Sequence, residues 1–401
     1  MMGENDMLLH HEPGTPQLMG QMNRATVINI LTKLGPISQT QICDLTGLSR
    51  ATVSTIIADL RKEELVVAVS RAASTSGRRR VLLELNGDAG YVIGVDLGGT
   101  NMAGAVTNLL GKVIYSLKQP TCASDGPEAV FQSLLRFIRR LAAESQIDQG
   151  RIKGVGIGIP GVVVKGREVQ WAPSLKWKDY PLVDNLSAHI DFPIFLENDV
   201  NLQALGEYWY GLGQGVDVLV CLAIGTGLGA GIVINGQVFF GSHQAAGEVG
   251  NLVLDTSQLG QPYPGFGFLE SWASGSAIGQ RYMEFSGSSE LVDAETVFKL
   301  ARQDDPIALK VVKGFSEHLA MAIVSISTVL DPELIILGGG VAKEADLFLP
   351  KLEELALPVL QTRPRLVASE LGDIAGVMGA VALTLHNTNG QLLSSYKRVG
   401  E

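Results

Sequence analysis

Three glycine-rich loops, each beside a run of apolar residues, could bind phosphate groups. They lie in the segments VIGVDLGGTN from Val92, AIGTGLGAGIV from Ala223 and LIILGGGV from Leu334. Backbone N–H groups in such loops can point toward an anion, and glycine lets the chain approach it closely. One such glycine is weak evidence, because turns need glycine in any case. The candidate phosphate-facing residues are Asp96, Gly98, Gly99, Thr100, Gly225, Thr226, Gly227, Gly338 and Gly339.

The first loop fits neither of the common nucleotide-binding patterns. A Rossmann fingerprint needs GxGxxG before a helix, and a Walker loop needs GxxxxGK followed by Ser or Thr. After Thr100 the residues are small and β-like as far as Val106, and Asn108 to Gly111 predicts a turn before a second strand. The loop is therefore expected inside a β-hairpin. In actin-like sugar kinases a strand–loop–strand of this kind faces phosphate, and an Asp placed like Asp96 binds Mg²⁺ through water.

A carboxylate adjoins an amide in the segment FLENDVN, which starts at Phe195. At the end of a strand, Asp199 could act as a general base that takes the proton of a sugar hydroxyl, while Asn198 holds a neighbouring hydroxyl. The same dipeptide is also common at turns and at helix N-termini, where it caps backbone N–H groups. Spacing alone leaves both interpretations open.

The composition limits what the rest of the chain can be. The 401 residues suffice for two or three domains. Residues 1–86 carry nine Lys/Arg and eight Asp/Glu, whereas the remainder carries 22 and 33. An acidic body does not bind nucleic acid indiscriminately, but a near-neutral head with clustered basic residues can. Three scattered cysteines and the lack of a long apolar run indicate a cytoplasmic protein without a membrane segment.

Residues 23–86 have the pattern of a winged helix-turn-helix. The second helix is expected to begin with a capping box from Ser38 to Gln41 and to end at Gly47, in the left-handed C′ position. Ser49 can cap a third helix, and two β-like runs with a polar turn between them predict a wing. The apolar stripes are Val27, Ile30, Leu31 and Leu34 in the first helix and Val53, Ile56, Ile57 and Leu60 in the third.

Short polar residues and arginines gather where a recognition helix and a wing would meet DNA. The alternative is a small helical bundle for protein contact. The wing and the arginine cluster together with the capping signals favour operator DNA as the partner. The candidate DNA-contacting residues are Gln39, Thr40, Ser49, Arg50, Thr52, Ser54, Thr55, Arg78, Arg79 and Arg80.

From about residue 23 to residue 390 the chain resembles the ROK family (repressors, open reading frames and kinases). The matching motifs are VDLGGTN, IGIPG at Ile157–Gly161, APSLKW at Ala172–Trp177, ENDVN, IGTGLGAGIVINGQ, GEVGN, GFLE and LIILGGG. The resemblance implies an α/β fold: a two-lobed actin-like (ribonuclease H-like) sugar-kinase body with an N-terminal winged helix-turn-helix. The implied domains are a flexible tail at 1–22, the winged helix-turn-helix at 23–86, lobe one at 87–199 plus about 374–395, and lobe two at 200–373.

The resemblance also implies a sugar site. Glu248 matches the Glu of the family's GE-x-G-H motif, and Glu270 matches the Glu that ends a cysteine run. The implied sugar-binding residues are Asn198, Asp199, Glu248, Asn251 and Glu270. Ser174 replaces the usual Asn of an A-P-N-L motif, so hydroxyl recognition is expected to differ from that of glucose-type members.

One part of the family pattern is missing. The His that follows GE-x-G and the three Cys of a CxCGxxGC run bind a structural Zn²⁺ in other members. Here Asn251 replaces the His, and Gln261, Tyr263 and Phe268 replace the cysteines. None of these side chains supplies a thiolate and Asn is a poor zinc ligand, so we predict no metal site.

Three functions therefore compete. The first is a carbohydrate-responsive repressor that needs no cofactor, binds operator DNA as a homodimer or dimer of dimers, and is released by a sugar or sugar phosphate between its lobes. The second is an ATP-dependent sugar kinase that uses Mg-ATP, with Asp199 as its catalytic base. A third is a sensor controlled by a phosphotransferase protein. The rebuilt zinc segment favours the first, because a misplacement of about 1 Å can cost on the order of a hundredfold in rate.

Overall fold

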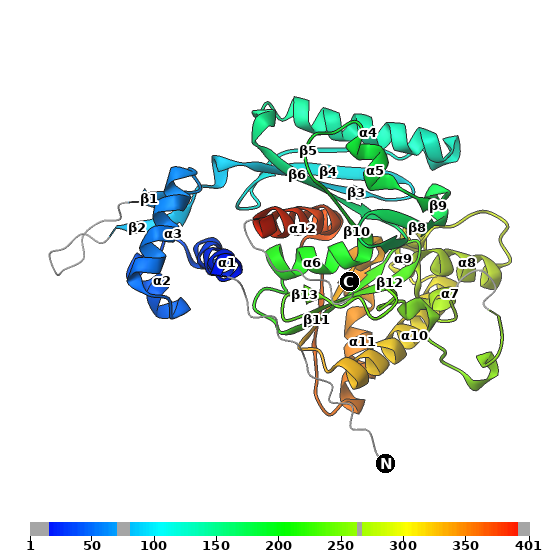
Figure 1. The fold of residues 1–401 in the computed structure, drawn as a ribbon. Helices are drawn as coiled ribbons and strands as arrows, with labels where there is room; N and C mark the ends of the chain where they lie inside the picture. Colours follow the sequence, from blue (N-terminus) through cyan, green and yellow to red (C-terminus); the bar gives the residue numbers. More distant parts are fainter. Residues whose placement is uncertain (1–15, 70–80, 263–266, 392–401) are drawn as a thin grey trace, which may run out of the picture. The chain divides into compact units, whose positions relative to one another are not determined.

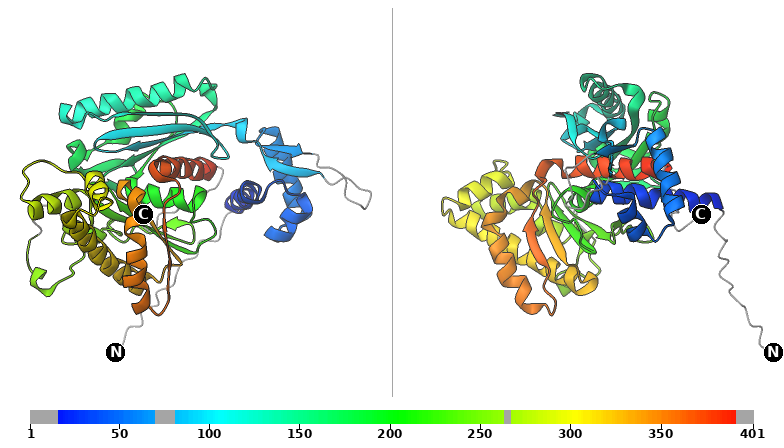
Figure 2. Two further views of the ribbon diagram at one scale, coloured as in Figure 1. Left: turned by 180° about the vertical axis from the view of Figure 1, so that it is seen from behind. Right: turned by 90° about the vertical axis from the view of Figure 1, so that its left-hand side faces the viewer.

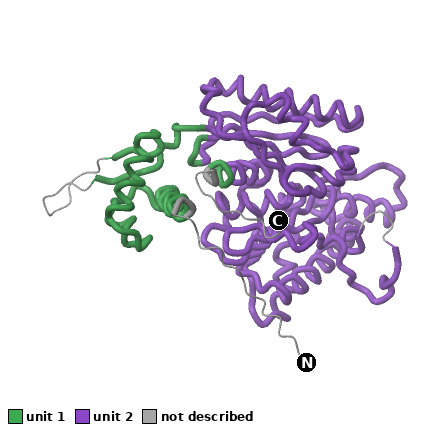
Figure 3. Tube along the Cα trace, viewed as in Figure 1, with its two compact units in different colours: residues 1–90, 108–110, 385–401 green, residues 91–107, 111–384 purple. Residues whose placement is uncertain are grey.

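The computed structural model describes residues 16–69, 81–262 and 267–391. The chain forms two compact units, coloured separately in Figure 3. The first unit comprises residues 1–90, 108–110 and 385–401, and the second comprises residues 91–107 and 111–384. None of the helices within the described ranges is long and apolar enough to cross a membrane.

The first unit is a winged helix-turn-helix. An antiparallel pair of strands follows its three helices, and Val66 pairs with Leu85 at one end of that ladder. A short 3₁₀ turn, η1, then leads out of the wing. The bounds are α1 Pro16–Leu34, α2 Gln39–Thr46, α3 Arg50–Lys62, β1 Val66–Val69, β2 Leu82–Leu85 and η1 Gly87–Ala89.

The predicted caps of this unit are confirmed. The Ser38 N–H donates to Gln41 Oε1 at 3.1 Å, and the Gln41 N–H donates to Ser38 Oγ at 3.4 Å. Gly47 ends α2 with a φ of 69°, which only glycine adopts without strain. Ser49 Oγ accepts the Thr52 N–H at 3.1 Å and so starts α3. The predicted apolar stripe of α3 is buried as expected.

Two predictions about α1 were wrong. The helix begins at Pro16, inside the predicted flexible tail of residues 1–22, because proline is favourable in a first helical turn and a single interior Gly20 costs only about 1 kcal/mol. Leu34 is 55% exposed, since it is the last residue of the helix. The residues of α1 that are buried are Ala25, Val27, Ile28 and Leu31.

The first unit also includes a distant turn of the chain. The Leu109 N–H donates to the Gly87 carbonyl at 3.0 Å, and Asn108 Nδ2 donates to Asp88 Oδ1 at 3.2 Å. These bonds hold residues 108–110 against η1. The unit is therefore assembled from separate stretches of sequence.

The second unit contains two five-stranded sheets, and the first has the strand order β10-β6-β3-β4-β5. Strands β10, β6 and β3 run parallel, whereas β4 and β5 form the predicted hairpin. Helices α4 and α5 cover one face of this sheet (Figure 1). The bounds are β3 Tyr91–Leu97, β4 Asn101–Asn108, β5 Val113–Pro120, η2 Ala123–Asp125, α4 Pro127–Glu144, η3 Gln149–Arg151, β6 Ile152–Ile159, α5 Leu182–Ser187 and β10 Ile194–Asn198.

A small antiparallel sheet sits between β6 and α5 in the sequence. It has the order β7-β8-β9, and the 3₁₀ turn η4 joins its last two strands. The Trp177 ring stacks on Tyr180 with 4.9 Å between ring centroids, which fixes β9. The bounds are β7 Val162–Val164, β8 Glu168–Ala172, η4 Pro173–Leu175 and β9 Trp177–Tyr180.

The second large sheet has the order β13-β12-β11-β14-β15. Strands β11 and β12 are antiparallel, whereas β11, β14 and β15 are parallel. Helices α7 to α11 pack around a core that includes Phe298, Phe315 and Phe348. The bounds are β11 Val218–Ile224, β12 Leu228–Ile234, β13 Gln237–Val238, η5 Val249–Asn251, η6 Thr256–Gln258, α7 Glu270–Ala273, α8 Gly275–Ser286, α9 Ala294–Ala301, α10 Pro306–Leu330, β14 Leu334–Gly338, η7 Gly340–Leu347, α11 Leu349–Ala356, η8 Leu357–Val359, β15 Arg365–Ala368 and η9 Gly372–Ile374.

Helices α6 (Asp199–Tyr210) and α12 (Ala375–Gln391) lie between the two large sheets, as the rear view in Figure 2 shows. Glycines let their backbones touch. A Cβ at Gly379 would lie 1.7 Å from the Leu202 carbonyl oxygen, and one at Gly206 would lie 2.2 Å from that of Ala375. No side chain fits at either position, so the helices pack backbone against backbone.

We therefore expect Gly379→Ala to destabilise the second unit by about 1–3 kcal/mol or more, because the new methyl group would displace α6. Gly340→Ala is the matched control, since a Cβ at Gly340 meets no atom within 4 Å. Urea denaturation of both variants measures the difference. Equal stabilities would contradict this account of the packing.

Candidate functional site

Two carboxylates converge where parallel strands of the first large sheet end. Asp96 lies near the end of β3, and Asp199 is the first residue of α6, directly after β10. Strand β6 runs between β3 and β10, and its Gly158 pairs with Asp96. A Cβ at Gly158 would lie 3.6 Å from Asp96 Oδ1 and 3.5 Å from Asp199 Cα. Glycine at position 158 therefore lets the Asp199 backbone and the Asp96 carboxylate come close to β6.

Burial makes both carboxylates hard to ionise. Burial raises the pKa of Asp96 to about 6, although the positive charge of Lys118 opposes the shift. Burial, together with the negative charge of Asp96, raises the pKa of Asp199 to about 7 against a hydrogen bond from the Val200 N–H. Near neutral pH, Asp199 can therefore accept or give up a proton. A carboxyl of this kind suits a general base or an acceptor for a ligand hydroxyl.

Asn198 caps helix α6. Its Oδ1 accepts the Val200 N–H at 2.9 Å and the Asn201 N–H at 3.0 Å, and its Nδ2 donates to the Gly161 carbonyl at 3.0 Å. Of the two interpretations of the Asn-Asp dipeptide, capping is thus the role visible in the structure. The cap also fixes Asp199 at the start of α6, next to Asp96.

Two glutamates from η5 and α7, which follow the strand β12, interact electrostatically with this group. Glu270 begins α7, and its carboxylate accepts the Leu228 N–H. Burial raises the pKa of Glu270, and the charge of Glu248 adds to the increase. Glu248 is exposed at the start of η5, and its charge also raises the pKa of Asp199. The charge of Glu248 thus acts on both Asp199 and Glu270, and that of Asp96 acts on Asp199.

Asn251 lies at the end of η5 and is exposed. Its Oδ1 is 2.6 Å from the place where a Cβ of Gly267 would be, so it faces the chain that leads into α7. Ser174 lies in η4, and a Cβ at Gly99 would be 2.9 Å from Ser174 Cβ. The altered APSLKW segment therefore borders the first glycine loop.

The three glycine loops follow strands, as predicted. In the first, the Gly98 N–H donates to the Asn101 carbonyl at 2.9 Å, and Thr100 is exposed. In the second, the Gly225 N–H donates to the Gly227 carbonyl at 3.0 Å, and Thr226 is exposed. In the third, Gly338 ends β14.

Gly339, next to the third loop's Gly338, has a φ of 80° and lies against the Ile224 backbone, where a Cβ would be 2.4 Å from the carbonyl oxygen. The third loop is thus packed against the strand that precedes the second.

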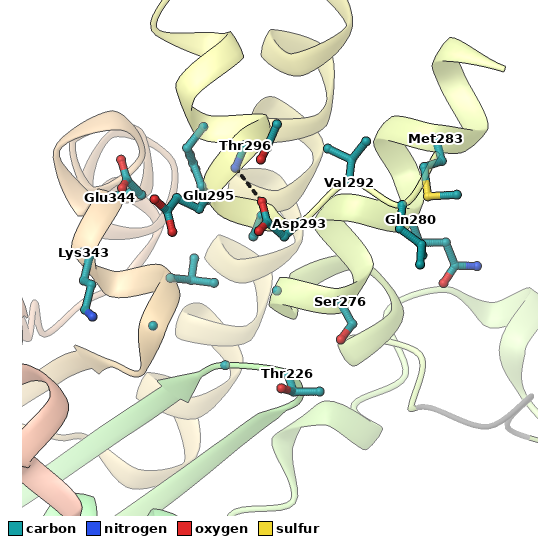
Figure 4. Close-up of a pocket in the computed structure, with 17 residues that line it drawn as sticks. Thr226, Ser276, Gln280, Met283, Val292, Asp293, Glu295, Thr296, Lys343 and Glu344 are labelled. Carbon is teal, nitrogen blue, oxygen red and sulfur yellow. Dashed lines mark hydrogen bonds between the residues drawn. The ribbon is translucent and has the colours of Figure 1, made fainter. Parts of the chain in front are cut away.

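A cavity of about 1280 Å³ opens beside the second and third loops (Figure 4). Thr226 and Ser276 lie at one end, while Lys343 and Glu344 face Gln280 and Met283 across it. Asp96 and Asp199 are not among its lining residues. The part of the wall that α8 and α9 supply was not predicted from the sequence, because those residues form no motif. The lining residues are Gly225, Thr226, Gly275, Ser276, Gln280, Met283, Leu291, Val292, Asp293, Ala294, Glu295, Thr296, Phe298, Gly340, Val341, Lys343 and Glu344.

Most charged groups of the cavity are already paired. Lys343 Nζ lies 2.8 Å from Asp373, and Glu344 lies 2.8 Å from Arg302. Asp293 accepts the Thr296 N–H at 2.8 Å and caps α9. The lining contains three carboxylates and one lysine, a balance that does not favour a highly charged anion.

Across the described part of the chain, no three His, Cys, Asp or Glu side chains gather in a way that could hold a metal ion. Gln261 and Asn251 are exposed and Phe268 is half-buried. Tyr263 lies outside the described residues. The cysteines Cys43, Cys122 and Cys221 are free thiols.

The predicted DNA-contacting residues of the first unit fall into three groups. Ser49 and Thr52 join their hydroxyls at 2.9 Å at the start of α3. Arg78, Arg79 and Arg80 lie outside the described residues. The remaining candidates are exposed on α2 and α3: Gln39, Thr40, Arg50, Ser54 and Thr55.

A winged helix-turn-helix followed by a two-sheet α/β body with carboxylates and glycine loops at its strand ends defines a class of regulators built on a sugar-kinase-like, actin-like fold. This chain belongs to the ROK family: the ROK family model matches residues 92–387, and the MarR family model matches residues 21–80. The N-terminal unit is accordingly a MarR-like winged helix.

Similar proteins include regulators and kinases. A xylose repressor of Caldicellulosiruptor bescii is 29% identical over 393 residues, which cover 93% of this chain and 97% of the relative. A crystal structure of a ROK family transcriptional regulator, a homologue of the Escherichia coli MLC protein, has a TM-score of 0.80 and 27% identity over 94% of this chain and 98% of that one. A ROK glucokinase of Streptomyces griseus, solved with glucose and AMPPNP, has a TM-score of 0.63 and 30% identity over 73% and 99%.

The raised pKa of Asp199 predicts that ionising this residue lowers the stability of the folded chain at high pH. The pKa of this carboxyl is higher in the folded chain than in the unfolded chain, so the folded chain keeps its proton to a higher pH. The free energy of unfolding therefore falls as pH rises from about 4 through about 7. We expect Asp199→Asn to raise the melting temperature at pH 8 and to lose this advantage near pH 4.

Thermal denaturation at the two pH values measures the effect, with the exposed Asp191→Asn as the control. The cost corresponds to about 1.4 kcal/mol for each unit of raised pKa and is reduced by solvent screening. A gain that is the same at both pH values would contradict the assignment.

Proposed function

We propose that the protein is a carbohydrate-responsive transcriptional repressor. Two winged helices of a homodimer, or of a dimer of dimers, bind operator DNA in the cytoplasm. A sugar or sugar phosphate binds at the carboxylates of the second unit and lowers operator affinity. The observation that carries this proposal is that one chain combines a winged helix with a carboxylate-lined site and matches a xylose repressor over nearly the whole length of both proteins.

The polar groups of the site suit hydroxyl groups. Asp96, Asp199, Glu248 and Glu270 offer carboxylate oxygens, and a sugar presents several hydroxyl donors in a fixed arrangement. Bonds from these hydroxyls relieve the repulsion between neighbouring carboxylates. An anionic group bound directly among them would add to that repulsion.

Helix α6 is the element through which ligand binding would act on the rest of the body. Asp199 starts α6, and the helix packs backbone against backbone on α12. A ligand that binds one arrangement of these helices better than another shifts the population toward it. Helix α12 runs on without a break past Thr384, where the second unit ends. A change at Asp199 is thereby passed to a helix that both units share.

The second candidate is an ATP-dependent sugar kinase with a DNA-binding head. The pKa of about 7 at Asp199 favours it, because a general base works best near the operating pH. Asp96 and the exposed Thr100 and Thr226 would hold Mg-ATP, which supplies the phosphoryl group in this alternative. The carboxylates of the cavity lining argue against a triphosphate there.

The deciding experiment is a thermal-shift screen with D-xylose, D-glucose, N-acetyl-D-glucosamine and Mg-ATP, followed by an assay for ADP. We expect one sugar to raise the melting temperature, because a ligand that binds only the folded chain stabilises it, and Mg-ATP to have no effect. The same sugar should release operator DNA. ADP formation that disappears in Asp199→Asn would instead establish the kinase.

Arg50 gives a second test. It is exposed at the start of α3, so we expect Arg50→Ala to weaken binding to an operator selected from a random duplex library. If Arg50 contacts phosphate, the slope of log affinity against log salt should fall by about 1. Arg363→Ala, on the second unit and also exposed, is the control. Equal operator binding by both variants would argue against α3 as the recognition helix.

A further inference from the structure

Helix α7 carries Glu270 to the site although it is only four residues long. A single helical turn has little stability of its own, because nucleation costs more than one turn returns. The position of the Glu270 carboxylate must therefore be set by contacts that α7 makes with its neighbours. The side chain at the centre of these contacts is Trp272.

The Trp272 indole contacts two side chains from longer helices. Arg281 of α8 places its guanidinium carbon 3.9 Å from the indole centroid. The His318 ring of α10 stacks on the indole with 4.2 Å between centroids and 4° between planes. Both contacts are favourable for an aromatic ring, one as a cation–π pair and one as a stack. They tie α7 to α8 and α10 at once.

Hydrogen bonds fix the outer layers of this stack. His318 Nδ1 lies 2.7 Å from the Gly314 carbonyl oxygen, which orients the imidazole. Arg281 donates hydrogen bonds to Glu284 at 3.0 Å and to the Ser271 carbonyl at 3.3 Å. The second of these bonds ties Arg281 to the backbone of α7. A Cβ at Gly314 would lie 3.3 Å from Trp272 Cζ3, so glycine leaves room for the indole.

Trp272 follows Glu270 by two residues in the same helical turn. The Glu270 carboxylate accepts the Leu228 N–H. It fits between two glycines, with Oε1 3.3 Å from a Cβ position at Gly227 and Oε2 2.8 Å from one at Gly250. A carboxylate in so narrow a place loses its alignment if the turn that carries it shifts.

We propose that Trp272 is a positioning residue for effector binding: the Arg281–Trp272–His318 stack holds α7 so that Glu270 meets the sugar hydroxyls. The identity of the ligand rests on the proposed function. The link from the stack to Glu270 does not, because it follows from contacts within the folded chain. Trp272 acts through Glu270 and makes no contact with the ligand itself.

The test compares Trp272→Ala and Trp272→Phe with Phe285→Ala in the full-length protein. Phe285 is a matched control, because Lys310 Nζ lies 3.9 Å over its ring and joins α10 to α8 without involving α7. Calorimetric titration with D-xylose, D-glucose and N-acetyl-D-glucosamine measures the dissociation constant. Hydrogen exchange of residues 267–274 measures the order of α7.

We expect Trp272→Ala to raise the dissociation constant about tenfold, which is the loss of one well-placed hydrogen bond to a charged group. Trp272→Phe, which keeps an aromatic ring beside Arg281 and His318, should restore most of the affinity. Exchange in residues 267–274 should become faster in Trp272→Ala alone. Phe285→Ala should match the wild type in both measurements.

A double-mutant cycle separates positioning from general stability. In a Glu270→Gln background, Trp272→Ala should cause no further loss of affinity, since Trp272 acts only through Glu270. Additive losses, or equal losses in Trp272→Ala and Phe285→Ala, would overturn the proposal. If the wild type bound none of these sugars, the proposed effector would be wrong, and exchange in residues 267–274 alone would decide the role of Trp272.

Discussion

The close approach of α12 to its neighbours is the constraint on which the second unit depends. Bare backbone meets backbone where Gly379 faces Leu202 and where Gly206 faces Ala375, and the β3 residue Gly94 lies against Val377 in the same way. Gly376, in the first turn of α12, leaves room for the Asp96 carboxylate, since a Cβ there would lie 2.6 Å from Asp96 Oδ2. The packing of these helices between the two sheets thus also determines the position of the Asp96 carboxylate.

The site places several carboxylates close together. Burial and repulsion from Asp96 and Glu248 raise the pKa of Asp199 to about 7, whereas burial alone raises the pKa of Asp96 to about 6 against the positive charge of Lys118. Such a group is costly until a ligand with hydroxyl donors shares its oxygens. The same arrangement serves a sensor, which needs binding alone, and a kinase, which also needs a base. This is why one family can contain both, and why the carboxylates by themselves do not distinguish them.

Local features of the chain were predictable where a short pattern has one physical solution. A capping box at Ser38 and a left-handed Gly47 are such cases, as are glycine loops that follow apolar strands. The failures came where neighbours distant in sequence decide. Leu34 fits an apolar stripe but ends its helix in solvent. Asn198 allowed two roles, and only the Gly161 carbonyl and the start of α6 reveal the cap. Tertiary packing alone creates the cavity wall from α8 and α9 and the stack on Trp272. No spacing of residues in the sequence predicts either of them.

The division of α12 between the compact units bears on how such a regulator can be modified. The first unit takes in residues 108–110 and the chain from Leu385 as well as its winged helix, and the bonds from Leu109 to Gly87 and from Asn108 to Asp88 show that the strand turn is part of it. A chimera made by exchanging only the first 90 residues would separate the winged helix from residues 108–110 and from the end of α12, which belong to the same compact unit. The head of this protein is therefore not an interchangeable module: grafting it onto another body requires three segments of sequence to move together.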